Sequence, residues 1–345
     1  MVTDRWKTTV RVLDLPLAER FSIATETWDT ARNVFVVVEH EDAYGVGEVQ
    51  PSERWDENPE SVSKEIESAD LTALRGPFDL EGVSTLLPPG AARSALDLAL
   101  HDLAATLMGV PVADMLGLGG RDIAPTSMTV PIADLDTMVE RARKLAHFPK
   151  LKMKVGFDGD VDAVGAIREV YGGDIRVDAN EGWSEEEAID RLPRLEQFRI
   201  ELCEQPIRRE QFDALHRVTE VSPIPVYADE DAGSAEDVAR LAGVVDGVNL
   251  KLRKSGGIRE LARAATVARA HGMGVMIGCD LESGIATSAG AHVAAVADFV
   301  DLDGATLLAE DPFPGVTYDG AQLVLPKGPG LLGSEGKARA LEALL

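Results

Sequence analysis

Three carboxylates stand at nearly even intervals in the chain, between two lysines. The acids are Asp178, Glu204 and Asp229, and each closes a short apolar run. Lys154 precedes them and Lys251 follows, and neighbouring members of the series are 22 to 26 residues apart. This spacing is about the length of one strand, one helix and two short loops, so each residue is expected to close a successive βα unit. Because strand ends of a (β/α) barrel surround one mouth, we expect all five side chains to share a pocket.

Acids at three adjacent strand ends predict a divalent metal site. So dense a set of negative charges is tolerable when a cation lies between them, and hard oxygen ligands favour Mg²⁺. The competing interpretation is that each acid caps the helix that follows it, which is common for a single strand-end acid. The flanking lysines favour the metal site for Asp178, Glu204 and Asp229 taken together.

The lysines predict proton transfer. Lys152 and Lys154 differ by two, so both point to one face of their strand, which is expected to be the barrel interior. Proximity to a bound cation lowers the pKa of an amine, so that it can accept a proton near neutrality. Lys251 closes the sixth strand, almost opposite the second, and the two amines would flank a substrate. This suits proton removal beside a carboxylate, with the enediolate held on the metal. Opposed bases favour racemisation or epimerisation, without excluding elimination or cycloisomerisation.

The elements that must position these residues fall into two regions. Residues 6–50 alternate and then turn apolar, which predicts an antiparallel meander, and residues 92–116 have helical spacing up to a Gly-rich stop. We therefore expect an α+β capping domain over residues 1–119. Beyond it, eight apolar segments alternate with charged, Ala-rich stretches, which predicts an α/β fold with a modified (β/α)8 barrel over 120–312. The last crossover looks short. Residues 313–345 carry one strand-like run, AQLVLP, and are expected to pack back on the capping domain.

Composition restricts the partners and the compartment. The formal charge of −25 disfavours nucleic acid and anionic membrane surfaces, since the field of the protein would repel both. The acidity fits either a solvated surface or a high-salt environment. No window reaches the roughly 18 apolar residues needed to span a bilayer, and the N-terminal sequence lacks a signal-peptide core, so a cytoplasmic location is expected. Cys203 and Cys279 lie in apolar strand-like segments, and no disulfide is expected.

Five motifs, in this order, resemble those of the enolase superfamily in its muconate-lactonising branch: LKMKVG, VDANEGW, CEQPI, ADE and NLKLRKSGG. Sites of this superfamily use a Lys or His base with Mg²⁺. The resemblance covers nearly the whole chain. It implies that Lys154 and Lys251 are the acid/base pair, that Lys152 supports the substrate carboxylate, and that the three acids bind Mg²⁺. Asn180 and Glu230 would support the metal ligands.

The segment DLDG narrows the reaction. Asp301 and Asp303 share one strand face, and two acids there can bind an ammonium group. The segment is similar to the D-x-D motif of dipeptide epimerases, which holds the α-ammonium of the substrate. The competing interpretation is a helix cap or a surface pair. Thr129, in the first barrel strand, is a further candidate for substrate binding.

Specificity departs from the Ala-Glu epimerase pattern, which places an arginine in a mobile loop of the first domain. The matching stretch here has Thr25, Glu26 and Trp28, with Arg32 nearby. Asp280 follows the seventh strand, where a neutral residue would be usual. If Glu26 and Asp280 face the pocket, a cationic or neutral second residue fits better than glutamate.

The leading hypothesis is a Mg²⁺-dependent dipeptide epimerase that inverts the α-carbon of the C-terminal residue of a small-molecule dipeptide. The alternatives within the superfamily are N-acylamino-acid racemase, o-succinylbenzoate synthase and muconate cycloisomerase. A non-catalytic, metal-dependent binding module is a third reading, which the intact lysines and acids disfavour. Barrels of this kind often form homo-oligomers, but no segment of the sequence identifies an interface.

Overall fold

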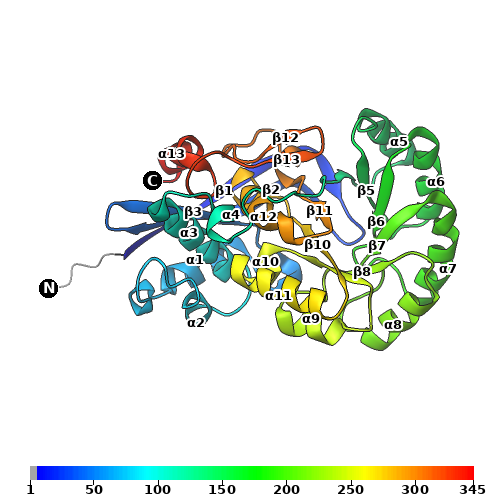
Figure 1. Cartoon of the computed structure of the whole chain (residues 1–345). Helices are drawn as coiled ribbons and strands as arrows, with labels where there is room; N and C mark the ends of the chain where they lie inside the picture. The colour runs from blue at the N-terminus through cyan, green and yellow to red at the C-terminus, as the bar shows by residue number, and fades with distance from the viewer. Residues whose placement is uncertain (1–5) are drawn as a thin grey trace.

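The structure is a computed structural model that describes residues 6–345. It begins with a three-stranded antiparallel sheet of β1 (Trp6–Ser22), β2 (Thr27–His40) and β3 (Ala43–Val49), which confirms the predicted meander. The helix α3 (Ala91–Met108) packs on this sheet. Gly45 and Gly47 make the close approach possible, because a Cβ atom there would lie 2.0 and 2.1 Å from backbone oxygens of α3. The sheet and α3 are the body of the capping region (Figure 1).

Short helices complete the capping region. Gly109 ends α3 in the left-handed conformation, and the predicted helical hairpin is finished by the short helix α4 (Val112–Met115). The loop between β3 and α3 carries further turns that the sequence did not predict. They are η1 (Glu53–Trp55), α1 (Pro59–Ser68), η2 (Leu71–Ala73) and α2 (Val83–Leu86).

The second region is an eight-stranded parallel barrel, and all eight predicted strands are confirmed. In sheet order they are β4 (Met128–Val130), β5 (Lys150–Lys154), β6 (Asp174–Asp178), β7 (Ile200–Glu204), β8 (Val226–Ala228), β9 (Gly247–Leu250), β10 (Gly274–Gly278) and β11 (Phe299–Asp301). A bridge between Thr126 and Val300 joins the two edges of the sheet, so the barrel is nearly closed. The α/β fold class is therefore as expected.

Helices cover the outside of the barrel along most of its circumference (Figure 1). They are α5 (Leu135–Lys144), α6 (Asp160–Val170), α7 (Glu185–Leu195), α8 (Phe212–Val221), α9 (Ala235–Leu241), α11 (Ile258–Ala270) and α12 (Gly284–Val293). Shorter turns are η3 (Glu196–Phe198), α10 (Leu252–Ser255) and η4 (Ala294–Val296). After β11 there is only η5 (Gly304–Leu307), which confirms the short last crossover.

The C-terminal residues return to the capping sheet. β13 (Gln322–Val324) is the strand predicted in AQLVLP, and it pairs with β12 (Thr317–Asp319), which the sequence did not predict. The helix α13 (Gly333–Leu344) contacts β1, β2 and β3. The buried amine of Lys337 lies 2.8 Å from the Asp102 carboxylate on α3, which holds α13 in place.

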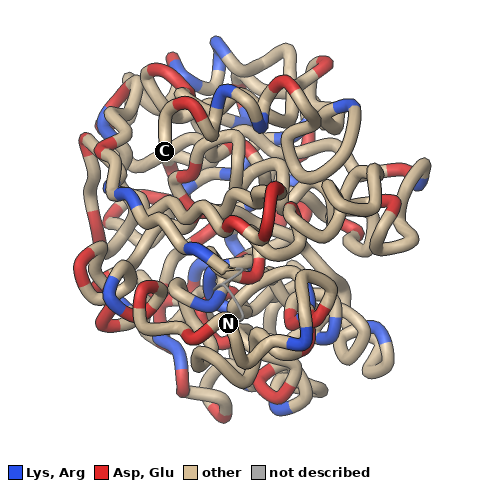
Figure 2. Tube along the Cα trace, turned by 90° about the vertical axis from the view of Figure 1, so that its left-hand side faces the viewer, with Lys and Arg blue, Asp and Glu red and all other residues tan. Residues whose placement is uncertain are grey.

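Charged positions of both signs are interspersed along the chain (Figure 2). Surface acids such as Asp190 and Glu185 are paired with Arg194 and Arg217, and such pairs reduce the repulsion between neighbouring acidic side chains. None of the helices in the described part of the chain combines the length and the hydropathy that crossing a membrane requires.

Candidate active site

The carboxyl ends of β5, β6 and β7 form the centre of the site. Lys154 lies beside Asp178 in the parallel register, and Asp178 lies beside Glu204. Asp178 and Glu204 are fully buried, and Asp229, which follows β8 directly, is 1% exposed. The evenly spaced residues have become neighbours because each one closes a strand of the same barrel.

Sharp backbone turns follow the strands that carry Asp178 and Glu204. Asn180, Glu181 and Gln205 adopt left-handed φ angles of 43°, 66° and 34°. Such angles are uncommon outside glycine and cluster at functional sites. Gln205 also organises the next strand end, because its side-chain oxygen accepts a hydrogen bond of 2.8 Å from the backbone N–H of Asp229. Sequence reasoning did not single out Gln205, although a buried amide directly after an apolar strand was a usable signal.

Lys152 and Lys154 point to the same face of β5, as predicted. The Lys152 amine lies 3.0 Å from the Asp178 carboxylate, 2.8 Å from that of Glu204 and 2.8 Å from that of Asp301. The Lys154 amine donates a hydrogen bond of 2.7 Å to Asp178. Lys152 is 1% exposed and Lys154 is 7% exposed, so the first lies deeper in the barrel. Each amine is matched by carboxylate charge, which makes its burial tolerable.

Two further lysines lie on the opposite side, against Asp229. Lys251 directly follows β9, and its amine lies 3.0 Å from the Asp229 carboxylate. Lys254, in the short helix α10, contacts the carboxylate and the backbone oxygen of Asp229. The sequence analysis gave Lys254 no role. The sequence feature that could have identified Lys254 is its spacing of three residues from Lys251. Residues three apart in a helix lie on the same face.

A cavity of about 520 Å³ lies between the capping region and the mouth of the barrel. Lys154 and Lys251 both line it, at the ends of strands that are second and sixth in the sheet order. The three acids lie below it and do not line it. The other sequence-predicted residues that line the cavity are Glu26, Thr129, Lys152, Asn180, Glu230, Asp280, Asp301 and Asp303.

Asp301 and Asp303 are both buried, so they are not a surface pair. Asp301 is paired with Lys152 and accepts a hydrogen bond of 2.6 Å from the Ser127 hydroxyl. Asp303 accepts one of 2.7 Å from the backbone N–H of Thr129. Burial and the neighbouring negative charge of Asp301 raise the pKa of Asp303 to about 7. Asp303 thus has more capacity than Asp301 to bind a new cation.

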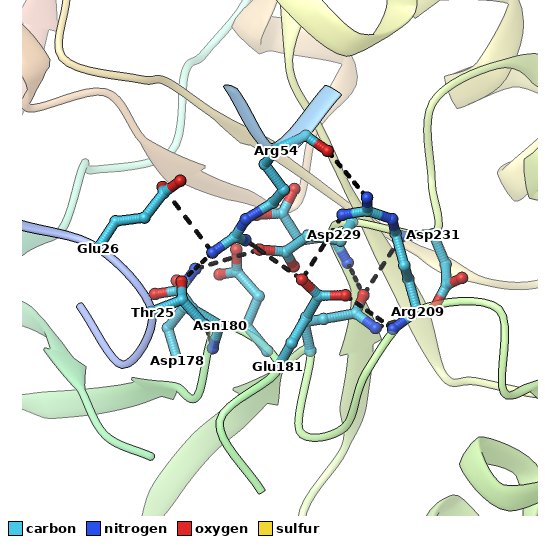
Figure 3. A network of polar contacts seen from close by, with 12 residues as sticks. Thr25, Glu26, Arg54, Asp178, Asn180, Glu181, Arg209, Asp229 and Asp231 are labelled. Atoms are coloured by element: carbon cyan, nitrogen blue, oxygen red, sulfur yellow. Dashed lines mark hydrogen bonds and ion pairs between the residues drawn. The ribbon is translucent and has the colours of Figure 1, made fainter. Parts of the chain in front are cut away.

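Arg54 connects the capping loops to the barrel, and the sequence analysis missed it (Figure 3). From η1 its guanidinium contacts the Glu230 carboxylate and the Thr25 hydroxyl. It also lies 3.5 Å from the Glu181 carboxylate and 4.0 Å from that of Glu26. The candidate named from sequence, Arg32, also lines the cavity, where it pairs with Asp14 and Glu60.

The charge of Asp280 is already matched. Its carboxylate accepts a hydrogen bond of 2.8 Å from Arg253 and lies 3.6 Å from the Lys251 amine. The guanidinium of Arg253 lies 4.2 Å from the centre of the Trp55 ring, over its face. Asp280 therefore faces the cavity as part of an ion-pair network that links the barrel to the capping loop.

The buried charges shift one another's pKa values. Burial and the negative charge of Asp178 raise the pKa of Glu204 to about 8. Burial also opposes the ionisation of Asp178, but Lys152 and Lys154 outweigh it and lower that pKa to about 2. Burial lowers the pKa of Lys251, but the Asp229 and Asp280 carboxylates outweigh it, so the net shift is upward. From sequence, a lowered lysine pKa is expected when the amine lies beside a bound cation. In this structure the neighbours of Lys251 are carboxylates, which act in the opposite direction.

The donor set of the three acids fits a hard divalent cation. In residues 6–345, no three Asp, Glu, His or Cys side chains are already arranged to hold a metal ion. Lysine amines lie against the acids and balance their charge. Glu230 Oε2 and Asn180 Oδ1 are buried and accept no hydrogen bond from the described residues, whereas Glu204 Oε2 lies 2.8 Å from the Lys152 amine. Buried oxygens that lack donors beside fully buried carboxylates are the ligands such a cation prefers.

Comparison with known proteins finds epimerases and a racemase that resemble this chain over most of its length. An L-Ala-D/L-Glu epimerase of Bacteroides thetaiotaomicron is 36% identical over 334 residues, which cover 95% of this chain and 87% of that protein. A dipeptide epimerase of Enterococcus faecalis, solved with Mg and L-Leu-L-Tyr, has a TM-score of 0.89 at 31% identity over 94% of this chain and 98% of that one. An N-succinyl Arg/Lys racemase of Bacillus cereus has a TM-score of 0.89 at 27% identity over 98% of this chain and 96% of its own.

The family matches cover both regions of the fold. Residues 7–117 match the N-terminal domain of the mandelate racemase / muconate lactonizing enzyme family. Residues 135–335 match the family described as enolase C-terminal domain-like. The chain therefore belongs to the enolase superfamily, in its mandelate racemase and muconate-lactonizing branch, and is an isomerase.

Proposed function

We propose that this protein is a Mg²⁺-dependent dipeptide epimerase that inverts the α-carbon of the C-terminal residue. The observation that carries the proposal is the placement of Lys154 and Lys251, which reach one cavity from strands four positions apart in the barrel. Two amines on opposite sides of a bound substrate can remove an α-proton from one face and return one to the other. The named epimerases among the relatives support the same reaction.

Each lysine alternates between two protonation states. In one direction, Lys154 in its neutral form accepts the α-proton while the protonated Lys251 donates a proton to the opposite face. In the other direction the roles are exchanged. The Lys152 amine, held among three carboxylates, stays protonated because burial, which lowers its pKa, is outweighed by their charges. It offers a fixed positive charge to the substrate carboxylate at the cavity floor.

Asp178, Glu204 and Asp229 would hold the Mg²⁺, with Asn180 and Glu230 supporting them. When bound, the cation supplies positive charge that stabilises negative charge developing on the substrate carboxylate. Asn180 fits a supporting role because its backbone N–H donates a hydrogen bond of 3.0 Å to Asp178. Its side-chain amide also donates one of 3.4 Å to Glu230.

A substrate with a free amine fits the opposite end of the cavity. Asp303, with Asp301 behind it, would bind the α-ammonium of the dipeptide. From sequence, Glu26 and Asp280 would make the region around the second side chain negatively charged. In the structure both acids are paired with arginine or lysine, so that region carries less net negative charge. We therefore favour a neutral second residue over a cationic one, and equal turnover of Ala-Leu, Ala-Lys and Ala-Glu would remove this preference.

The test is exchange of the substrate α-proton in D₂O, followed by mass spectrometry with Mg²⁺ present. The panel contains dipeptides and N-succinyl amino acids with the same reacting residue. Exchange confined to free-amine dipeptides supports the epimerase. Exchange only with N-succinyl amino acids would favour the racemase reaction, the alternative that the Bacillus cereus structure brings forward. Absence of exchange with every compound would contradict both.

A further inference from the structure

A second cavity of about 620 Å³ adjoins the one described above. Four residues, Phe21, Thr129, Asp303 and Leu307, line both cavities. The Asp303 carboxylate therefore stands at the junction of the two spaces. No residue of the proton-transfer machinery lines the second cavity, so the reaction as proposed leaves it without a role.

The cavity lies where the barrel lacks its eighth helix. Every other barrel strand is followed by an α-helix of at least seven residues before the next strand, but β11 is followed only by η5. The chain then runs against β1 of the capping sheet, where the Ala309 N–H donates a hydrogen bond of 2.8 Å to the Pro16 oxygen. The face of α5 that an eighth helix would cover instead borders the cavity, opposite a segment of β1 that contains Ala18 and Glu19.

The walls of this cavity suit an uncharged, apolar group. Its inner part is lined by Phe21 and Met128, each 8% exposed, and by the half-buried Leu145 and Leu307. Charges of both signs stand at the outer rim, where Arg141 on α5 pairs with Glu19 on β1. Besides Asp303, the charged residues that line the cavity are three acids, Glu19, Asp136 and Glu140, and two bases, Arg141 and Lys144, whereas the apolar interior favours hydrocarbon over water.

We propose that this second cavity binds the side chain of the N-terminal residue of the dipeptide, and that large apolar side chains are preferred there. The inference rests on the proposed function, which places the α-ammonium at Asp303. The N-terminal α-carbon is bonded to that ammonium, so its side chain begins at the junction and can enter the second space. The volume is about twenty times that of one water molecule in the liquid, which is ample for leucine, methionine or phenylalanine.

The test compares X-Ala dipeptides that differ only at the first residue, by α-proton exchange in D₂O. For the wild-type protein, kcat/KM for Leu-Ala is expected to exceed that for Ala-Ala by at least about tenfold, since even a single added methylene in an apolar pocket is discriminated by about 10- to 200-fold. Ala18 lines only the second cavity and is exposed, so Ala18→Trp can obstruct it without disturbing the core. This variant should lose the Leu-Ala advantage while Ala-Ala turnover stays at the wild-type level.

The matched control is Ala73→Trp, the same substitution at an exposed position that borders neither cavity. It should retain the preference for Leu-Ala. Equal kcat/KM for Leu-Ala and Ala-Ala in the wild type would overturn the inference while the epimerase function stood. So would an Ala18→Trp variant that slowed both substrates equally. Exchange with no dipeptide would overturn the function, and this inference with it.

Discussion

The two halves of the active site are built in different ways. The barrel half consists of strand ends, and its charged groups, Lys152, Asp178 and Glu204, are 0 to 1% exposed. The capping half consists of loops and a 3₁₀ turn, and its charged groups, Glu26, Arg54 and Glu57, are part-buried. Arg54 and Glu57 pair with barrel residues, and Glu26 pairs with Arg54. The proposed reacting groups thus lie at strand ends, where neighbouring residues fix their geometry, whereas loops would contact the variable parts of a substrate.

This difference separates catalysis from specificity. Removing a group from the barrel half should affect the chemical step for every substrate. Removing a group from the capping half should affect stability, or the ranking of substrates, more than the chemistry. Two experiments test that division and two more test the role of Asp303 and the effect of burial on an ion pair, from the largest expected effect to the smallest.

Replacing either base lysine should nearly abolish epimerisation. Lys154→Ala and Lys251→Ala are each expected to lower kcat by about 10³-fold, the usual loss when a general acid–base group is removed. Each variant should still exchange the α-proton of the one diastereomer whose proton faces the remaining lysine. The measurement is diastereomer-resolved exchange in D₂O.

Lys150→Ala is the control, because Lys150 shares the strand face of Lys154 but pairs with Asp174 and Glu201 outside the cavity. Loss of exchange with both diastereomers in either variant would contradict two opposed bases.

Arg54→Ala should destabilise the protein, because it removes the cation that connects the capping loop to the barrel. The Arg54 side chain is 10% exposed, and Glu230 beside it is 3% exposed. Breaking a buried pair by removing one partner typically costs about 3 kcal/mol, since the other charge is left uncompensated. Urea unfolding measures the change. A second variant, Arg54→Ala with Glu230→Gln, should recover much of the loss, and the absence of any recovery would show that Glu230 is not the partner that matters.

The role of Asp303 can be tested by its pH dependence. Its pKa is raised to about 7, so the carboxylate is ionised above that pH and increasingly neutral below it. An ammonium group binds the ionised form, so KM for dipeptides should rise as the pH falls below 7. Asp303→Asn should raise KM by about 10- to 100-fold, as expected for a lost hydrogen bond to a charged group, and should remove this limb of the profile. If the Asp303→Asn variant showed the same rise of KM below pH 7, that rise would come from the titration of another group.

The smallest effect is expected for an ion pair on the outside of the barrel. Arg194 on α7 donates a hydrogen bond of 2.9 Å to Asp190, and both side chains are more than half exposed. Arg194→Ala should change the free energy of unfolding by less than about 1 kcal/mol, because water and salt screen exposed pairs. Urea unfolding beside Arg54→Ala provides the direct comparison. If Arg194→Ala lowered the free energy of unfolding as much as Arg54→Ala, burial would not explain the difference in strength between the two ion pairs.

The strand-end residues were predictable from sequence because their positions follow a local period. Each of the eight strands was found from its own apolar run, and Asp178 and Glu204 lie at the last residues of β6 and β7, as expected. Lys251 lies one residue beyond β9, within the usual uncertainty of a strand boundary. The short crossover after β11 was visible as well, since too few residues separate that strand from the Gly/Pro-rich tail.

Arg54 was not predictable in the same way. It lies in a loop without periodicity, and its partner Glu230 is 176 residues away in the chain. Asp280 was identified from sequence, but its ion-pair partners were not. The sequence marked it as an added acid, while its pairing with Arg253 and Lys251 depends on how β10 and α10 are placed.

The sequence by itself determined the barrel, the order of its strands, and the lysines and carboxylates at their ends. Those features depend on short-range patterns, namely alternation, apolar runs and the length of one βα unit. Only the tertiary structure decided which charges neutralise one another, that Arg54 closes the capping loop onto the barrel, and that a second cavity opens beside Asp303. These features depend on the packing of the capping sheet against the barrel. Side chains from distant segments meet there, and no local pattern encodes their distances.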